Sequence, residues 1–276
     1  MKFRLGSRLL LIALLAIGLI GCSNIVDVVN QLPENRDLSF IGPNSGTGEL
    51  VSSGNDTFEA SEFESIEVSA DAMAIYVTRS INNKAEVELL IDNSIDNHFT
   101  YKASISSNTL KIDVDEATNT FDFAKSNQKG ERKLLISLPE KLYKKVNISN
   151  EIGIIEAAEL QANSVKINSD VGTIRLSEVA GEMNLTIDVG EITVDGFLLD
   201  NDLSIKAEVG EVMVHLNEAP EAAAINLTSE IGEVTAELDH IDFSKNSTNK
   251  KMGTIGTDGP RLDIQTEVGS ILVDIK

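Results

Sequence analysis

The sequence is poor in the residues from which most catalytic and metal-binding sites are built. Its 276 residues include one cysteine, three histidines, three tyrosines and no tryptophan. A single thiol allows no disulfide within the chain and no cluster of cysteine ligands around a metal. The aromatic content of 4% also weakens any function that depends on stacking sugar rings against aromatic side chains.

Positive charge is scarce as well. The chain has 23 lysines and arginines against 44 aspartates and glutamates, which gives a formal net charge of −21. Such a charge repels nucleic acids and anionic lipid surfaces, and it attracts cations. We therefore expect no nucleic-acid partner, and a well-solvated surface is the simplest interpretation of the acidic composition.

The sequence does contain many aliphatic residues in short alternating runs. Hydrophobic residues make up 42% of the chain, and 19 glycines supply turn positions between the runs. Apolar and polar residues alternate clearly over 63–68, 87–91, 101–105, 110–114 and 134–138. No window after the first 21 residues sustains a helical period, so the pattern predicts an all-β chain.

The first residues are typical of an export signal. Three basic residues within the first eight precede an apolar run from Leu9 to Ile20, which is short for a membrane span. The run ends in Leu19-Ile20-Gly21-Cys22, which resembles the lipobox of bacterial lipoproteins. That resemblance implies a signal peptide over residues 1–21 and acylation of Cys22 as the lipid-attachment site. The alternative is an ordinary signal peptide with a chance cysteine.

Lipidation would fix the location of the mature chain. Removing residues 1–21 takes away three basic residues and no acid, so the mature net charge is near −24. Two or more acyl chains hold a protein stably on a bilayer. We expect an extracytoplasmic protein in the cell membrane of a Gram-positive host or, as Ser23 allows, in the outer membrane of a Gram-negative host.

The chain then divides into three parts. Residues 22–56 are turn-rich, with several glycines and prolines, and they are predicted to be a flexible tether. Residues 57–145 are predicted to be an N-terminal β region with a polar loop over 116–130. Residues 146–276 contain an internal repeat.

In this repeat an apolar residue followed by glycine recurs at intervals of 16 to 22 residues. The copies are Ile152-Gly153, Val171-Gly172, Val189-Gly190, Val209-Gly210, Ile231-Gly232 and Val268-Gly269, with a weaker one at Met252-Gly253. We number each copy from its apolar residue as position zero. Positions −6 and −4 are then apolar, and position −1 is acidic, in all six stronger copies.

The parity of these positions predicts the shape of each copy. Even spacing from −6 to zero places the apolar side chains on one face of a strand, and the apolar positions +3 and +5 break that parity. A glycine at +1 permits the bend that returns both segments to one core. Because one unit cannot bury its apolar face alone, the copies predict a β-solenoid or β-roll of about seven repeats of about 20 residues. The weaker copy predicts a loop over Ser244–Lys251 and an atypical final coil that serves as a cap.

With these residues in view, the chain resembles the DUF4097 family of adhesin-like proteins with β-strand repeats. The resemblance rests on Phe63–Val68, Leu134–Pro139, Tyr143 and the glycine-centred copies, and it extends over about residues 57–276. It implies an extracytoplasmic β-solenoid linked to the cell envelope. The family offers no catalytic residues to transfer.

The histidines give no sign of a metal site. His98, His215 and His240 are far apart and match no metal-ligand spacing. No nucleophile, phosphate-binding, zinc or calcium-loop motif is present in the sequence.

The acidic residue at position −1 is the sharpest remaining feature. Stacking would place one carboxylate per coil, from Glu151, Asp170, Asp188, Glu208, Glu230 and Glu267. Like charges about 5 Å apart repel each other, so a Ca²⁺ ion bound through carboxylate oxygens is one hypothesis. The interpretation we favour is that these side chains extend into solvent near Lys166, Lys206 and Arg175.

These observations predict a non-enzymatic, lipid-anchored structural or interaction module of the bacterial cell envelope, with no catalytic residue, cofactor or metal. The expected partners are membrane lipid, through acylated Cys22, and an envelope protein or glycan. Some β-solenoids act on polysaccharides, so a glycan-active enzyme or a polysaccharide-binding protein is the alternative. Such sites need clustered acids with arginine or lysine and aromatic platforms, but only Phe197 and Phe243 follow Tyr143.

Overall fold

The computed structural model describes residues 48–95, 99–116 and 130–276. The signal peptide, Cys22, the predicted tether as far as residue 47 and most of the predicted loop over 116–130 lie outside these residues. The described chain consists of strands with one short 3-10 helix at Ala60–Glu62, which confirms the all-β prediction. No helix in this part of the chain is long and apolar enough to cross a membrane.

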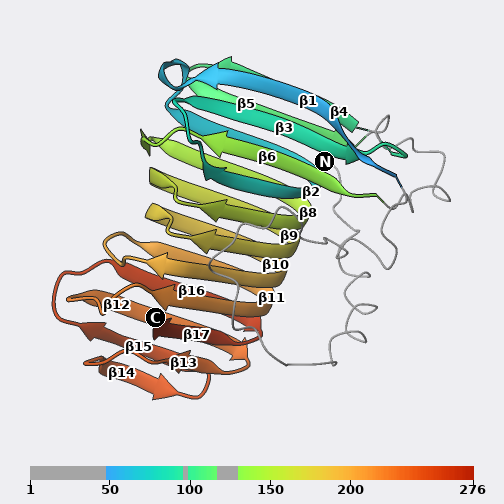
Figure 1. Cartoon of the computed structure of the whole chain (residues 1–276). Helices are drawn as coiled ribbons and strands as arrows, with labels where there is room; N and C mark the ends of the chain where they lie inside the picture. Colours follow the sequence, from blue (N-terminus) through green and yellow to red (C-terminus); the bar gives the residue numbers. More distant parts are fainter. Residues whose placement is uncertain (1–47, 96–98, 117–129) are drawn as a thin grey trace, which may run out of the picture. The chain divides into compact units, whose positions relative to one another are not determined.

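The strands all join one hydrogen-bonded sheet (Figure 1). In chain order they are β1 (Leu50–Glu59), β2 (Ser65–Arg79), β3 (Lys84–Asp92), β4 (Phe99–Ser106), β5 (Thr109–Glu116), β6 (Arg132–Leu138), β7 (Leu142–Tyr143), β8 (Lys145–Ala158), β9 (Gln161–Ser177), β10 (Ala180–Phe197), β11 (Leu203–Leu216), β12 (Ala223–Ile231), β13 (Val234–Ala236), β14 (Asp242–Ser247), β15 (Lys250–Ile255), β16 (Arg261–Val268) and β17 (Ile271–Ile275).

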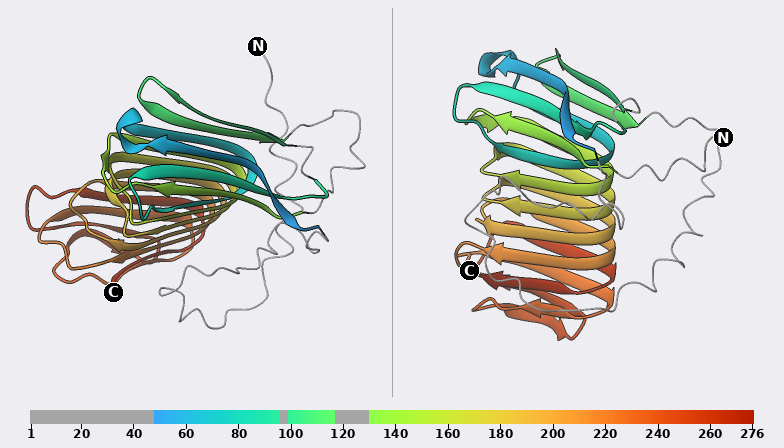
Figure 2. Two further views of the ribbon diagram at one scale, coloured as in Figure 1. Left: turned by 45° about the horizontal axis from the view of Figure 1, so that its top comes forward. Right: turned by 45° about the vertical axis from the view of Figure 1, so that its right-hand side comes forward.

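The middle of the sheet is a stack of long parallel strands. β2, β8, β9, β10 and β11 lie side by side in that order, and each is curved so that its two arms face a shared interior (Figures 1 and 2). Equivalent repeat positions pair with each other, for example Val146 with Val165 and Gly172 with Gly190. We call each curved strand, or each pair of strands that together occupy the same layer, a rung. The β-solenoid prediction is confirmed.

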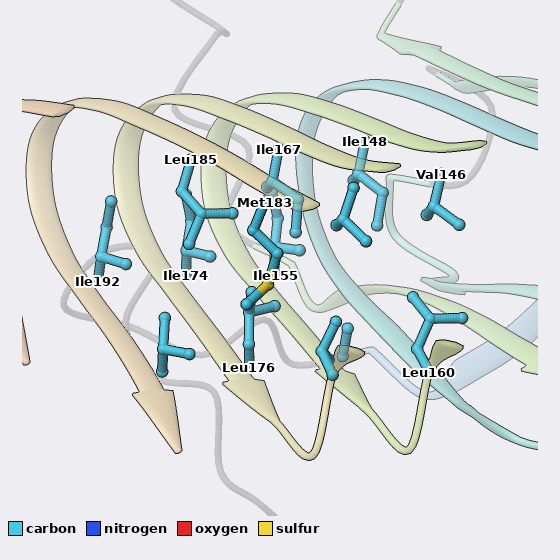
Figure 3. Close-up of a cluster of buried hydrophobic side chains, with 14 of the residues drawn as sticks. Val146, Ile148, Ile155, Leu160, Ile167, Ile174, Leu176, Met183, Leu185 and Ile192 are labelled. Atoms are coloured by element: carbon cyan, nitrogen blue, oxygen red, sulfur yellow. The ribbon is translucent and has the colours of Figure 1, made fainter. Parts of the chain in front are cut away.

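The core is made of the predicted apolar positions, stacked rung upon rung (Figure 3). Val146 and Ile148, at positions −6 and −4, and Ile155, at +3, are at most 1% exposed. Their counterparts in the next two rungs are Val165, Ile167, Ile174, Met183, Leu185 and Ile192, all equally buried. Burying one such side chain contributes about 1.5–3 kcal/mol, so the stack is held mainly by contacts between rungs.

The corner of each rung differs from the prediction at one position. Position −2 faces the core, since Asn150 and Ser169 are 1% and 3% exposed, whereas Ile152 at position zero is 47% exposed. The expectation that the residue at zero faces the core is therefore wrong. The ladder of paired residues is interrupted at −1 in both strands without a change of register, and the glycine at +1 has a positive φ. At this corner positions −1 and zero both face outward.

At the C-terminal end, chain order and spatial order differ. The last rung, β16 with β17, lies between β11 and the rung formed by β12 with β13. Leu262 of β16, for instance, pairs with Leu203 on one side and with Ile225 on the other. The final coil is therefore an interior rung, and the prediction that it caps the stack is wrong.

The cap at this end is the hairpin of β14 and β15. β15 runs antiparallel to β12 and covers its outer edge, and β14 lies beyond β15. The predicted loop over Ser244–Lys251 is thus mostly strand, and Met252-Gly253 belongs to the hairpin rather than to a coil. Alternation of polar and apolar side chains is absent here because neither face of β14 is buried.

The N-terminal end shows the same kind of insertion. β2 lies between β8 and a rung formed by β5 with β6. Beyond that rung, β4 runs antiparallel to β5, β3 to β6 and β1 to β3. The stack of rungs therefore extends beyond the predicted repeat region, residues 146–276, into the N-terminal β region.

The predicted tether ends too late in the chain. Residues 50–56 belong to β1, which pairs with β3 along its whole length. Gly54, one of the glycines that suggested a turn-rich tether, lies at a bulge between Ser52 and Gly54 in this strand instead. A Cβ atom at Gly54 would overlap the ring of Tyr101, so this glycine makes room for a side chain of β4.

Candidate interaction surface

The glycines at +1 form a continuous line along one corner of the solenoid. Gly190 has a φ of 148°, and a Cβ atom there would overlap the carbonyl oxygen of Gly172. The same relation links Gly153, Gly172, Gly190, Gly210, Gly269 and Gly232 in that spatial order. Glycine is therefore required twice over, by the backbone angle and by the close approach of the next rung. The backbone of these six corners is consequently held in the same geometry.

That geometry stacks the acidic residues of position −1, as predicted. Their spatial order is Asp71, Glu151, Asp170, Asp188, Glu208, Glu267 and Glu230, which we call the acidic column. The repeat pattern of the sequence does not include Asp71 of β2, because Met73 stands where the other rungs have glycine. Its register opposite Glu151 becomes visible only when β2 pairs with β8.

The carboxylates of the acidic column affect one another. Partial burial, and then the charges of Asp71 and Asp170, raise the pKa of Glu151 above its ordinary value. Burial raises the pKa of Glu208 in the same way, with smaller contributions from its neighbours Asp188 and Glu267. For Asp188 the causes of the raised pKa are again burial and then one neighbour, Asp170. Like charges on neighbouring strands therefore stand close enough to repel.

A line of apolar side chains runs beside the acidic column. It consists of the residues at position zero, which we call the apolar column: Ala72, Ile152, Val171, Val189, Val209, Val268 and Ile231. Ile152, Val268 and Ile231 are 47%, 42% and 69% exposed, and the other members are partly exposed. The two columns together form what we call the corner surface, a repeating arrangement of one carboxylate and one apolar side chain per rung.

Comparisons with known proteins agree with this architecture. Residues 143–274 match the family model described as Toastrack DUF4097. Those residues belong to the Toastrack family. The match covers the glycine-centred rungs, while the stack of rungs continues beyond it into β2, β5 and β6.

Two solved structures are similar to this chain. One is a protein of Clostridium sporogenes, provisionally named a cell adhesion protein, with 14% identity and a TM-score of 0.51; the alignment covers 83% of this chain and 100% of that one. Another is a Bacteroides fragilis protein, provisionally named an adhesin, with 12% identity and a TM-score of 0.38, at 84% and 99% coverage. The first likeness shows a shared fold. A search of curated protein sequences gave no match.

The structure does not bring the other predicted candidates together. Within the described residues, no group of three or more histidine, cysteine, aspartate or glutamate side chains is placed to hold a metal ion. His215 lies 2.5 Å from Asp274 of the neighbouring rung, and His240 is exposed in a turn. His98 lies outside the described residues. Calcium binding by the acidic column stays a hypothesis that this geometry does not test.

The basic residues expected to accompany the acidic column are not paired with it. Arg175 lies 3.4 Å from Glu156, on the other arm of the rung. Among the described residues, none of the ion pairs includes a member of the acidic column. The described residues therefore provide no ion-pair partner for the acidic column.

Two of the three aromatic side chains from Tyr143 onward are buried. Tyr143 and Phe197 are 1% exposed, and Phe243 of β14 is 37% exposed. Tyr143 also takes part in a structural contact. The Lys141 ammonium lies 5.0 Å from the centre of the Tyr143 ring and 4.0 Å from the centre of the Phe63 ring. Lys141 donates to backbone carbonyls, including that of Phe63 at 2.5 Å, and burial lowers its pKa. A shallow groove of about 400 Å³ lies beside it at the turns between rungs.

Proposed function

We propose that the chain is a lipid-anchored extracytoplasmic protein whose Toastrack domain is a non-enzymatic interaction module of the bacterial cell envelope. The observation that carries this proposal is the corner surface. It repeats one carboxylate and one outward apolar side chain over seven successive rungs, Asp71 and Ala72 through Glu230 and Ile231. A long periodic surface of this kind suits recognition of a long partner molecule better than it suits chemistry on a small substrate.

The positions of the aromatic residues favour this function over the glycan-active alternative. Cleavage or binding of polysaccharides uses exposed rings as platforms for sugars. Tyr143 and Phe197 are buried in the core instead, and the residues with raised carboxyl pKa values belong to a linear column rather than to a cleft. The provisional name of the Clostridium sporogenes protein, which has the same fold, is also consistent with an adhesive role.

The lipid anchor is supported by the sequence around Cys22 and is tested directly. The wild-type chain and Cys22→Ala are expressed in a bacterial host with labelled palmitate, and membranes are separated from soluble fractions. We expect label and membrane retention in the wild type and loss of both in Cys22→Ala. Ser23→Ala is the matched control and should keep both. A wild-type chain without label, or a Cys22→Ala chain that stays with the membrane, contradicts the anchor.

The interaction role is tested with the purified mature chain and isolated envelope fragments. We expect the chain to bind these fragments. Protease treatment of the fragments should abolish binding if the partner is a protein, and glycosidase treatment should abolish it if the partner is a glycan. Cleavage of envelope polysaccharide by the purified chain would contradict the non-enzymatic proposal. Absence of binding to every fragment would contradict the interaction module.

A further inference from the structure

The corner surface places two chemically different columns side by side. Because positions −1 and zero are both turned outward, each carboxylate has an apolar side chain as its neighbour on the same rung. Adjacent strands lie about 4.8 Å apart, so the seven rungs from Asp71 to Glu230 extend about 29 Å. The surface is thus a strip of fixed length with charge along one side and apolar groups along the other.

Among the described residues, no ion pair neutralises the charge of this strip, in contrast to other parts of the surface. Elsewhere, lysines and arginines lie against acids, as in Lys84–Glu59 at 2.8 Å, Lys111–Glu67 at 2.9 Å and Arg261–Asp202 at 2.9 Å. Lys206 is two residues from Glu208 on the same strand, yet neither residue belongs to an ion pair of the described residues. The pKa values of Glu151, Asp188 and Glu208 are raised mainly by burial, and the charges of neighbouring members of the acidic column raise them further.

The charge of the acidic column argues against several candidate ligands of the corner surface. A second copy of the chain would bring another acidic column and a formal net charge of −21 against the first. The chain's own residues 23–47 carry Asp27, Glu34 and Asp37 against Arg36 alone, so they are not a cationic ligand. Anionic lipid and nucleic acid are repelled. A small cation would neutralise the carboxylates but would leave the apolar column uncovered.

The spacing favours a helical partner over an extended one. Side chains on one face of an extended strand recur about every 6.7 Å, well above the rung spacing. Successive turns of an α-helix are about 5.4 Å apart, close to the rung spacing of about 4.8 Å, and a helix of about 20 residues is about 30 Å long. An amphipathic helix also presents two different side-chain stripes along its axis, as the corner surface does.

We propose that the corner surface binds a basic amphipathic helix of a partner protein, with lysine or arginine side chains against the acidic column and apolar side chains against the apolar column. This inference rests on the proposed interaction function and specifies the chemistry of the partner. The helix lies along the solenoid axis, so that each of its turns meets about one rung. Positive charge brings the partner to the surface, and contact with Ile152, Val268 and Ile231 holds it there.

The test uses the mature chain and a fluorescent 20-residue peptide of leucine and lysine at amphipathic helical spacing, measured by fluorescence anisotropy at several salt concentrations. The column variant is Asp170→Asn/Asp188→Asn/Glu208→Gln. The matched control, Glu182→Gln/Asp200→Asn/Glu221→Gln, removes the same charge at exposed positions away from the corner surface. We expect the column variant to weaken binding about tenfold or more and to reduce its salt dependence, and the control to change binding by less than about twofold.

The apolar column is tested separately with Val171→Thr/Val189→Thr/Val209→Thr, which keeps the shape of each side chain. We expect about three- to tenfold weaker binding with little change in salt dependence. A peptide with glutamate in place of lysine needs no protein variant and should not bind. The single substitution Glu208→Gln serves if a triple variant does not fold, as judged by its circular dichroism and melting temperature.

Three results would overturn the inference. The two charge variants could weaken binding equally, which would mean that only net charge matters. Spermine or Ca²⁺ could displace the peptide when each is added at the same concentration of positive charges as the peptide. That result would mean that any cation binds the column. The peptide could also fail to bind the wild type. In that last case, palmitate labelling of the wild type and its binding to envelope fragments are independent measurements, so a wrong partner class is distinguished from a wrong function.

Discussion

From β8 to β11, each rung of the solenoid pairs with the rung next to it in the chain. At both ends of the stack, the order of the rungs in space differs from their order in the chain. The first rung in the chain, β2, lies inside β5 and β6, and the last, β16 with β17, lies inside β12 and β13. In each case the rung nearest to the chain terminus is paired on both edges. The outermost layers are antiparallel additions, β1, β3 and β4 at one end and β14 with β15 at the other.

This difference separates the shape of a rung from its place in the stack. The repeat positions determine how a rung bends and which side chains it buries, and they are the same in the middle and at the ends. They do not determine its neighbour, because every rung presents equivalent apolar positions to both sides. At the C-terminal end, β15 covers the outer edge of β12, so the inner edge is the one left for β16.

The largest expected effect comes from removing residues 261–276. The four deeply buried side chains of this rung, Leu262, Ile264, Ile271 and Val273, together contribute more than about 6 kcal/mol. Because the rung is interior, its loss should also release β12–β15. Amide hydrogen exchange should therefore show lost protection over residues 223–255, with protection kept in β8, β9 and β10.

The matched deletion replaces the hairpin residues 242–255 with a short glycine-serine linker. That change exposes the edge of β12 but removes no interior rung, so protection of β16 and β17 should remain. If residues 223–255 stay protected after removal of 261–276, then β12 can dock directly on β11, and the order of rungs is not fixed by the contacts described above.

A second comparison concerns glycines in the middle of the stack. Gly190 combines a φ of 148° with contact to the backbone of the next rung, whereas Gly196 has a φ of 66°, and a Cβ atom there would approach no backbone atom closer than 3.8 Å. Gly190→Ala should lower the free energy of unfolding by more than about 3 kcal/mol and Gly196→Ala by about 1–2 kcal/mol. Urea denaturation measures both. Equal losses would mean that backbone angle, rather than the close approach of rungs, explains the glycine line.

Much of this architecture could be predicted from the sequence because the features that shape a rung lie within the rung's own residues. Alternation at −6 and −4, the acid at −1 and the glycine at +1 are local features, and they predicted the strands, the bend and the acidic column. The rung order was not predictable, because Leu262 fits beside Leu203 or Ile225 equally well. Asp71 was missed for a related reason, since only pairing with β8 reveals its equivalence to Glu151.

A third comparison tests the one wrong assignment within the rungs themselves. Ile225 and Ile231 both lie in β12 and are 3% and 69% exposed. Ile225→Ala should cost about 2–5 kcal/mol of unfolding free energy, and Ile231→Ala less than about 0.5 kcal/mol. Thermal or urea unfolding of the two variants distinguishes them. A large loss for Ile231→Ala would mean that position zero belongs to the core, as parity alone had indicated.

The smallest expected effect separates the middle of the acidic column from its end. Glu208 has Asp188 on one side and Glu267 on the other, whereas Glu230 stands on the last rung with Glu267 on one side only. Removing a charge that is repelled from both sides should stabilise the fold. Glu208→Gln should therefore raise the free energy of unfolding at pH 7 by about 0.3 kcal/mol after solvent screening, and Glu230→Gln by less.

The effect of Glu208→Gln on the free energy of unfolding should depend on pH. The pKa of Glu208 is raised in the folded chain by burial and by Asp188 and Glu267, so the folded state binds the proton more tightly than the unfolded state. Its ionised form therefore destabilises the fold above the folded pKa, and that penalty fades as the pH falls through this pKa toward the unfolded value. Urea unfolding of wild type and Glu208→Gln should accordingly differ at pH 7 and converge near pH 4. A gain that persists at pH 4 would point to better packing of the amide rather than to relief of repulsion, and added salt should shrink the gain at pH 7 but not at pH 4.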